Sequence, residues 1–180
     1  AIELNKLFLE VIIANGFDNN AIKILKAKKN LRLIDGTNYS LKELLKFMSF
    51  NQSILIQSED LYKFTNKNFK VVSKRNPTSK ELKDLIFAFN VCRYAKSNAI
   101  VLASNETTVG IGSGQPSRLD SCQIAINKMK KFNLNSDSLV AASDAFFPFV
   151  DGIEKLVQSG VRAVVQPSGS IRDKEIIKFA

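Results

Sequence analysis

Short apolar segments alternate with helical patterns through the second half of the chain, and this alternation constrains the fold most strongly. The segments AIVLA (99–103), SLVAA (138–142) and VRAVVQ (161–166) predict strands, and TTVGIG (107–112) predicts a hairpin with the first of them. Helical spacing fills the longer connections, so the last two strands should lie parallel in a sheet covered on both faces. The pattern predicts an α/β fold with a mixed sheet.

The first half of the chain gives weaker signals. The runs LFLEVIIA (7–14) and LRLI (31–34) predict strands on either side of a short helix that Asp18 can cap. The Asn-rich stretch that follows offers only short candidate strands, ILIQ (54–57) and FKVVS (69–73). This stretch is therefore expected to be a connector or a peripheral subdomain.

The glycine-rich segment GIGSGQPSRLDSC (110–122) resembles a phosphate-binding loop at first sight. The dinucleotide fingerprint needs a third glycine where Gln115 stands, and the Walker pattern needs a lysine directly after the glycines, where none occurs between Gly110 and Lys128. The sequence therefore excludes both kinds of nucleotide loop.

A helix is expected to begin near Ser117, at the end of that segment. Its first N–H groups and its dipole favour an anion, so the positive charge of Arg118 in the first turn is unfavourable there. We expect a negative partner for this arginine, either a ligand or a carboxylate such as Asp120 or Asp144. A plain surface pair with Asp120 is the alternative.

Composition narrows the chemistry. The 180 residues contain no histidine, which excludes histidine acid–base catalysis and histidine-ligated zinc within this chain. Residues 1–96 carry 17 Lys+Arg against 9 Asp+Glu, a surplus that attracts anions or simply forms a solvated surface. Cys92 and Cys122 lack metal-ligand spacing and are expected to be reduced thiols of a cytosolic protein. No membrane span or signal peptide is expected.

The hairpin followed by helix, strand and helix resembles the core of cytidine deaminases. Zinc deaminases carry H-x-E and P-C-x-x-C at the corresponding helix starts, where this chain has PSRLDSC and FFPFVD, so no zinc is expected. The resemblance implies a three-layer αβα sheet without zinc, with mostly parallel strands in the C-terminal half. It assigns residues 1–76 to the end of one subdomain plus a connector, and residues 77–180 to a second, truncated subdomain.

Several longer motifs are similar to one family, the AICAR formyltransferase region of the bifunctional AICAR formyltransferase/IMP cyclohydrolase enzymes of purine biosynthesis. They are LFLEVIIA (7–14), IKILKAKKNLRL (22–33), KSNAIV (96–101), VGIGSGQPSRLDS (109–121), ASDAFFPFVDGIEKLVQSGV (142–161) and QPSGSIRDKE (166–175). The resemblance implies formyl transfer from 10-formyltetrahydrofolate to the 5-amino group of AICAR in IMP biosynthesis. It also implies a cytosolic homodimer without membrane or nucleic-acid partners.

The resemblance further implies that the chain is an internal fragment. The family's Lys-His pair for proton handling is expected upstream of Ala1, so the chain alone is expected to be inactive. The resemblance also implies that the family's cyclohydrolase domain is absent from this chain. Val150 departs from the arginine that relatives often carry there, and residues 44–66 match the family poorly.

Site residues follow from the resemblance, position by position. Asn98 is expected at the reacting centre, where its amide hydrogen-bonds the formyl group or holds the substrate amine. Ser97 and Asp144 are candidates for a structural K⁺ site. The expected AICAR contacts are Glu10, Lys29 (to the phosphate), Arg118 and Phe146. The expected folate contacts are Pro148, Phe149, Asp151, Gly169 and Ser170.

The glycines of 110–114 are expected to let the end of the hairpin approach the ligand closely. The aromatic residues Phe146, Phe147 and Phe149 either belong to the core or line a pocket for a flat heterocycle. Two rival functions stay open: a catalytically silent binding or scaffold module, and a nucleic-acid binder that uses the basic first half.

Overall fold

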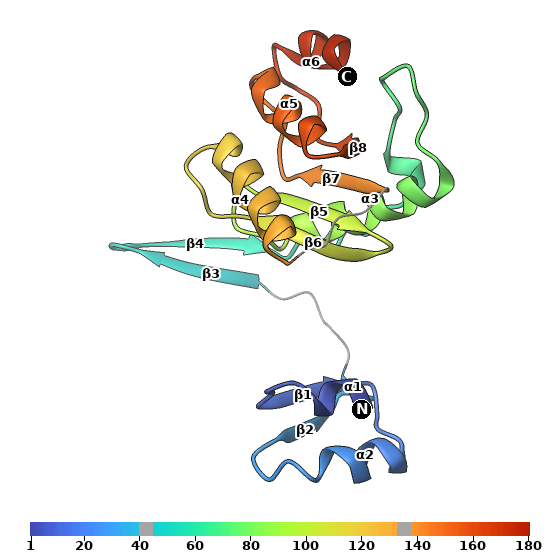
Figure 1. Ribbon diagram of the computed structural model, residues 1–180. Helices are drawn as coiled ribbons and strands as arrows, with labels where there is room; N and C mark the ends of the chain where they lie inside the picture. Colours follow the sequence, from blue (N-terminus) through green and yellow to red (C-terminus); the bar gives the residue numbers. More distant parts are fainter. Residues whose placement is uncertain (40–44, 133–137) are drawn as a thin grey trace. The chain divides into compact units, whose positions relative to one another are not determined.

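The computed structural model describes residues 1–39, 45–132 and 138–180 (Figure 1). The chain forms two compact units, Ala1–Leu61 and Tyr62–Ala180. The segment from Tyr62 to Asn76 thus belongs with the second unit by its contacts, whereas the division into deaminase-like subdomains at residue 76 stays a prediction. Among the described residues, no helix combines the length and the apolar character that crossing a membrane requires.

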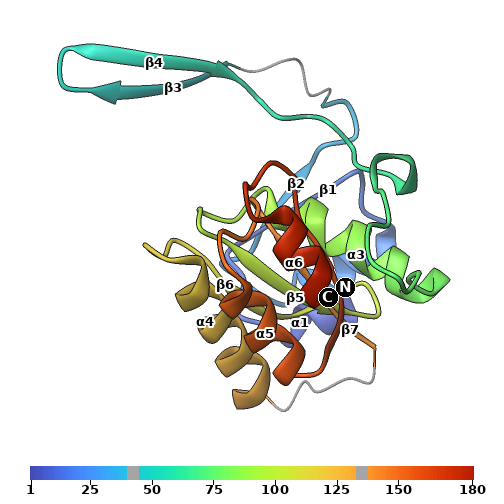
Figure 2. The same cartoon turned by 90° about the horizontal axis from the view of Figure 1, so that it is seen from above.

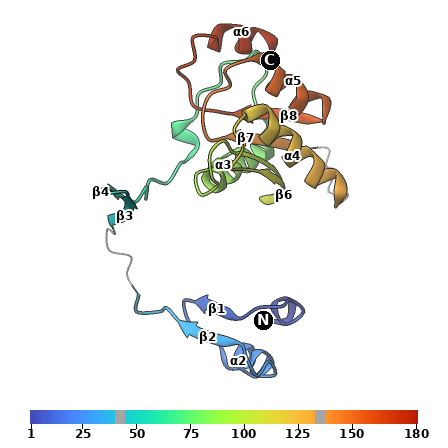
Figure 3. The same cartoon turned by 90° about the vertical axis from the view of Figure 1, so that its left-hand side faces the viewer.

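The N-terminal part of the first unit is a parallel strand pair joined through a helix. Strand β1 pairs with β2 from Val11 opposite Arg32 to Ala14 opposite Asp35, and Figure 3 shows the two strands side by side. The carboxylate of Asp18 accepts a hydrogen bond from the Ala21 amide at 2.6 Å, which confirms the predicted helix cap. The elements are α1 (Ile2–Asn5), β1 (Val11–Ala14), α2 (Asn19–Leu25) and β2 (Arg32–Asp35).

An antiparallel hairpin follows in the same unit. It consists of β3 (Leu45–Phe50) and β4 (Ser53–Ser58), and Asn51 in its turn has a φ of 51°. The structure confirms a strand at 54–57. The sequence does not predict the partner strand, because the Leu and Lys residues that precede LKFMSF are equally typical of a helix.

The second unit contains a four-stranded mixed sheet in the order β6-β5-β7-β8. Its strands are β5 (Ile100–Ser104), β6 (Thr107–Gly112), β7 (Leu139–Ser143) and β8 (Val161–Val165). The last two strands pair in parallel, as predicted, and β5 is antiparallel to both of its neighbours. Strands β6, β7 and β8 therefore share one direction, but the prediction of mostly parallel strands fails for the pairings, because only β7/β8 is a parallel pair.

Helices cover both faces of this sheet, which gives three layers. Side chains alternate along β5: Ile100 and Leu102 join the core beneath α4 and α5, and Val101 and Ala103 join the core beneath α3. All five residues of β5 and of β7 are buried, which explains why these strands are apolar on both faces. Figure 2 shows α4 and α5 side by side. The helices are α3 (Ser79–Cys92), α4 (Arg118–Lys131), α5 (Val150–Gln158) and α6 (Asp173–Phe179).

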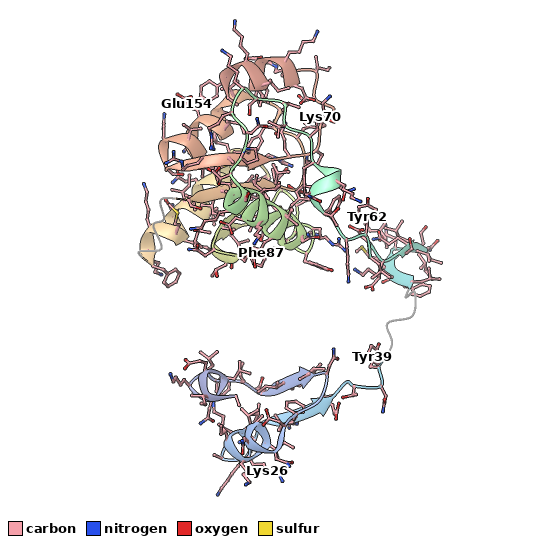
Figure 4. The ribbon with its side chains drawn as sticks, turned by 90° about the vertical axis from the view of Figure 1, so that its right-hand side faces the viewer. Lys26, Tyr39, Tyr62, Lys70, Phe87 and Glu154 are labelled. Carbon is pink, nitrogen blue, oxygen red and sulfur yellow. The ribbon has the colours of Figure 1, made fainter. Side chains whose placement is uncertain are left out.

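Residues 62–69 pack against α3 through aromatic rings. Phe64 and Phe69 each meet Phe89 of α3 edge to face, with ring centroids 4.8 and 5.6 Å apart, and Tyr62 packs on Phe64 at 5.0 Å. Figure 4 labels Tyr62 near α3 and Phe87 on that helix. The segment includes the short 3₁₀ helix η1 (Asn66–Asn68). The prediction of a strand at 69–73 is wrong, because residues 69–73 form no strand and Phe69 packs in this aromatic cluster.

Buried carboxylates fasten α3 to the rest of the unit. Glu81 closes a capping box with Thr78 and binds both terminal nitrogens of Arg75 at 3.0 Å. The guanidinium of Arg75 holds the pKa of the Glu81 carboxyl at about 2. Asp84, 1% exposed, accepts the amides of Asn105 and Glu106, the two positive-φ residues that turn β5 into β6.

Two of the glycines in the 110–114 segment serve packing. A Cβ on Gly110 would lie 2.2 Å from the carbonyl oxygen of Ala125, and one on Gly112 would lie 1.9 Å from that of Ser121. Strand β6 therefore contacts the backbone of α4 directly. The prediction that these glycines approach a ligand is wrong for both positions, and Gly114, with a φ of +69°, makes the turn that follows.

Candidate functional site

The topology of the sheet brings distant polar residues to one edge. Because β5 runs opposite to β6 and β7, its beginning lies at the edge where those two strands end. Asn98 precedes β5, Arg118 begins α4 after β6, and Asp144 follows β7 directly. The structure thus assembles a cluster that we call the strand-end cluster: Ser97, Asn98, Arg118, Ser121, Ser143 and Asp144.

Arg118 lies at the centre of the strand-end cluster, with its side chain 7% exposed. Its Nη1 donates to Oδ1 of Asn98 at 2.5 Å, and its Nη2 pairs with Oδ1 of Asp144 at 3.1 Å. Its Nε donates to Oγ of Ser143 at 3.0 Å. The expectation of a carboxylate partner is confirmed with Asp144, and the alternative of a surface pair with Asp120 is wrong.

Asp120 instead completes the helix cap of α4. The amide of Asp120 donates to Oγ of Ser117 at 3.1 Å, and the hydroxyl of Ser117 donates back to Oδ2 of Asp120 at 2.7 Å. The helix begins at Arg118, as its spacing predicts, and this cap leaves the arginine side chain to the cluster.

The hydrogen bonds of Asn98 define what its amide still offers. Nδ2 donates to the carbonyls of Gln115 at 2.9 Å and Pro116 at 3.3 Å, and Oδ1 accepts from Arg118. A side-chain amide has two donors and two lone pairs, so one lone pair of Oδ1 is left. Arg118 has five N–H donors, three of which these contacts use, so one N–H remains on each terminal nitrogen. The pair therefore presents two donors and one acceptor.

Asp144 connects the cluster to the sheet edge. It accepts the Ala99 amide at 2.8 Å and the Ser97 hydroxyl at 2.5 Å, in addition to its ion pair with Arg118. The two residues predicted for a monovalent cation thus contact each other directly. No three His, Cys, Asp or Glu side chains gather as a metal site within the described ranges.

Two fully buried serines support the cluster and escaped sequence reasoning. The hydroxyl of Ser121 donates to the carbonyl of Asn98 at 2.7 Å, and that of Ser143 donates to the carbonyl of Ala145 at 2.7 Å while its oxygen faces Arg118. For Ser143, the sequence does contain a signal, because a serine ends an otherwise apolar strand directly before Asp144.

The three phenylalanines after β7 divide between core and surface. Phe147 is 1% exposed and packs against Gly152, where an added Cβ would lie 2.7 Å from the ring. Phe146 is 39% and Phe149 50% exposed. The core interpretation therefore holds for Phe147, whereas Phe146 and Phe149 present large parts of their surfaces to solvent.

The loop after β8 lies against the loop after β7. Oε1 of Gln166 accepts the Phe147 amide at 3.0 Å, and a Cβ on Gly169 would lie 4.0 Å from Cδ1 of Phe146. Gly169 has a φ of +123°, which its neighbours in the loop could not adopt easily. The loops at the carboxyl ends of the parallel pair β7/β8 therefore bring Gly169, a predicted folate contact, next to Phe146, a predicted AICAR contact.

Within these loops the remaining predicted residues are accessible. Pro148 and Asp151 are exposed, and Ser170 is half-buried. Asp151 lies in the first turn of α5, as predicted, where its carboxylate accepts the Gly152 amide at 2.7 Å.

Two predicted AICAR contacts belong to the first unit. Lys29 is exposed just after α2, and Glu10 is exposed just before β1, where its carbonyl accepts the Arg32 amide at 2.9 Å. Lys29 lies in the short connection between α2 and β2 and thus in the same unit as Glu10, whereas the residues of the strand-end cluster belong to the second unit.

Both cysteines are fully buried free thiols on opposite faces of the sheet. Burial raises the pKa of Cys92 to about 12, with a smaller contribution from Asp144, and burial raises that of Cys122 to about 12 as well. Such thiols are poor nucleophiles at neutral pH.

Comparison with known proteins gives one consistent result. The family model described as AICARFT/IMPCHase bienzyme matches residues 1–128. Proteins called "Bifunctional purine biosynthesis protein PurH" are 45% identical over 179 residues in Persephonella marina, 48% over 179 in Buchnera aphidicola and 45% over 175 in Aquifex aeolicus. These matches cover 97–98% of this chain and 34% of each relative. The chain thus spans about a third of the length of the curated relatives it matches.

Proposed function

Because the chain belongs to the AICARFT/IMPCHase bienzyme family, we propose that it forms part of a formyltransferase acting on AICAR with 10-formyltetrahydrofolate as the formyl donor. The protein that contains it would then catalyse a step of IMP formation and also carry IMP cyclohydrolase activity. The observation that carries the proposal is the contact between Asn98 and Arg118 at 2.5 Å, at the strand edge where the family motifs KSN and GQPSR meet.

The free hydrogen-bonding capacity of this pair supports a division of roles. The remaining lone pair of Asn98 Oδ1 suits an N–H donor, so it holds the 5-amino group of AICAR rather than the formyl oxygen. The two remaining N–H groups of Arg118 suit an oxygen acceptor of the substrate. Burial of the guanidinium strengthens such hydrogen bonds, because little water competes for them.

The folate would lie against the loops after β7 and β8. Phe149 offers an exposed ring face for stacking on a pteridine, and Asp151 offers an exposed carboxylate to its amino-pyrimidine edge. Pro148, Gly169 and Ser170 complete this proposed subsite, and Phe146 flanks the AICAR ring. Lys29 and Glu10 of the first unit would contact the phosphate and a polar group of AICAR.

Further parts of the proposal concern fold, partners and ions. A cytidine-deaminase-like classification is supported by the order hairpin, α4, β7, α5, β8 in the second unit. The active protein would be a homodimer, and K⁺ would bind near Ser97 and Asp144. Since this chain has no histidine, we propose that it does not transfer the formyl group by itself.

The test is a formyl-transfer assay with AICAR and 10-formyltetrahydrofolate in the complete protein that contains this chain. Asn98→Ala should lower kcat roughly 10²-fold or more, the scale of losing one preorganised polar contact in a transition state. Asn127→Ala, which removes an exposed amide of α4 whose Oδ1 accepts a hydrogen bond from Gln123, is the matched control and should keep full activity. Unchanged turnover of Asn98→Ala would remove this residue from the reacting centre. Salt-sensitive binding to oligonucleotides without formyl transfer would favour the nucleic-acid alternative.

A further inference from the structure

A cation lies on the ring of one proposed folate contact. The guanidinium carbon of Arg172 is 4.7 Å from the centroid of the Phe149 ring, within the range of a cation–π interaction. Phe149 is nevertheless 50% exposed. The guanidinium therefore covers one face of the ring and leaves a large part of the residue open to a flat ligand.

The loop around Arg172 holds its backbone in place. Oγ of Ser170 accepts the Arg172 amide at 3.1 Å, and Oδ2 of Asp173 accepts the Gly169 amide at 2.8 Å. Glu175, one turn along α6, lies 3.7 Å from the guanidinium. These contacts fix the starting point of the arginine side chain next to Phe149.

Phe149 needs such support because of its place in the chain. It is the residue before α5, in extended conformation, with no side-chain cap bond. Its neighbour Phe147 is anchored in the core, but the Phe149 ring projects outward. The Arg172 guanidinium contacts this ring and so joins the loop after β8 to the loop after β7.

We propose that Arg172 is a positioning residue for the folate co-substrate. It holds the Phe149 ring so that the open face is ready to stack on the pteridine, which lowers the cost of ordering that ring on binding. The inference rests on the function proposed above. It assigns Arg172 to the folate and leaves the AICAR contacts at the strand-end cluster unaffected.

The experiment compares Arg172→Met, Arg172→Lys and the control Lys174→Met in the complete protein. Lys174 is exposed in the first turn of α6, two residues after Arg172, so its replacement removes the same charge and leaves the Arg172–Phe149 contact in place. The KM for 10-formyltetrahydrofolate should rise roughly 2- to 30-fold in Arg172→Met, the range between an exposed and a desolvated cation–π contact. Arg172→Lys should recover part of the loss, and Lys174→Met should match the unsubstituted protein. The KM for AICAR should stay constant in all three.

Two results would overturn the inference. One is a folate KM in Arg172→Met equal to that of Lys174→Met; the other is an equal rise of both KM values, which would indicate general damage to the fold. The Arg172→Lys variant keeps the test valid if the methionine variant folds poorly. Absence of formyl transfer in the unsubstituted protein would instead refute the proposed function, so the two failures are distinguishable.

Discussion

Replacement of Gly112 by alanine tests how strand β6 positions the strand-end cluster. The new Cβ would lie 1.9 Å from the carbonyl oxygen of Ser121, whereas real Cβ atoms keep at least 3.0 Å. Helix α4 must therefore retreat by at least 1.1 Å, the difference between these two distances. Such a shift stretches the hydrogen bonds that Ser121 and Arg118 make with Asn98, now 2.7 and 2.5 Å long.

We expect Gly112→Ala to lower the free energy of unfolding by about 3 kcal/mol, the upper end of the range for overpacking, because the added methyl group would collide with backbone atoms and not with a flexible side chain. For a unit of this size, that lowers the melting temperature by at least roughly 10 °C. Differential scanning calorimetry of the full chain measures it. Gly36→Ala is the control, since its Cβ would meet the nearest atom at an ordinary 3.5 Å. A Gly112→Ala protein that melts within about 2 °C of the unsubstituted chain would refute the packing argument.

Two further predictions concern titratable groups. The folded-state pKa of Glu81 is lowered from 4.5 to about 2, so its ion pair with Arg75 adds stability above pH 4.5 that is lost as the pH falls towards 2. In urea denaturation across this range, the free energy of unfolding should therefore depend less on pH for Glu81→Gln than for the unsubstituted chain. Equal pH dependence of the two proteins would contradict the assignment. The thiols of Cys92 and Cys122 have pKa values of about 12, so in the folded chain they should resist alkylation by iodoacetamide at pH 8 and react once urea is added. Mass spectrometry detects the alkylated cysteines. Rapid alkylation of the folded chain would contradict the burial of these two thiols.

The sequence predicts the second unit well because its signals are local and consistent. Continuous apolar strands, a helix cap at Ser117 and helices of crossover length all specify the same α/β arrangement. The pairing of β5 between β6 and β7 depends on which strands meet across the sheet. Which strands pair is decided by tertiary packing, which no local pattern encodes. The sequence therefore does not show that β5 forms two antiparallel pairs.

The candidate site was predictable in part. A cation at a helix start pointed to a negative partner for Arg118, and the structure supplies Asp144. The position of Ser143 at the end of an apolar strand, next to Asp144, is a signal in the sequence, but Ser121 lies within a helical pattern that does not show whether its hydroxyl forms a hydrogen bond. The role of the glycines at 110 and 112 has the same ambiguity, because a sequence does not show whether a helix or a ligand approaches them.

The central claim is that the strand-end cluster holds AICAR while the loops after β7 and β8 hold the folate. A crystal structure of the complete protein with AICAR and a folate analogue tests it most directly. We predict the AICAR amine within hydrogen-bonding distance of Asn98 Oδ1, an AICAR oxygen on the terminal nitrogens of Arg118, and the pteridine stacked on Phe149. Both ligands bound elsewhere, with Asn98 and Arg118 contacting only protein, would contradict it.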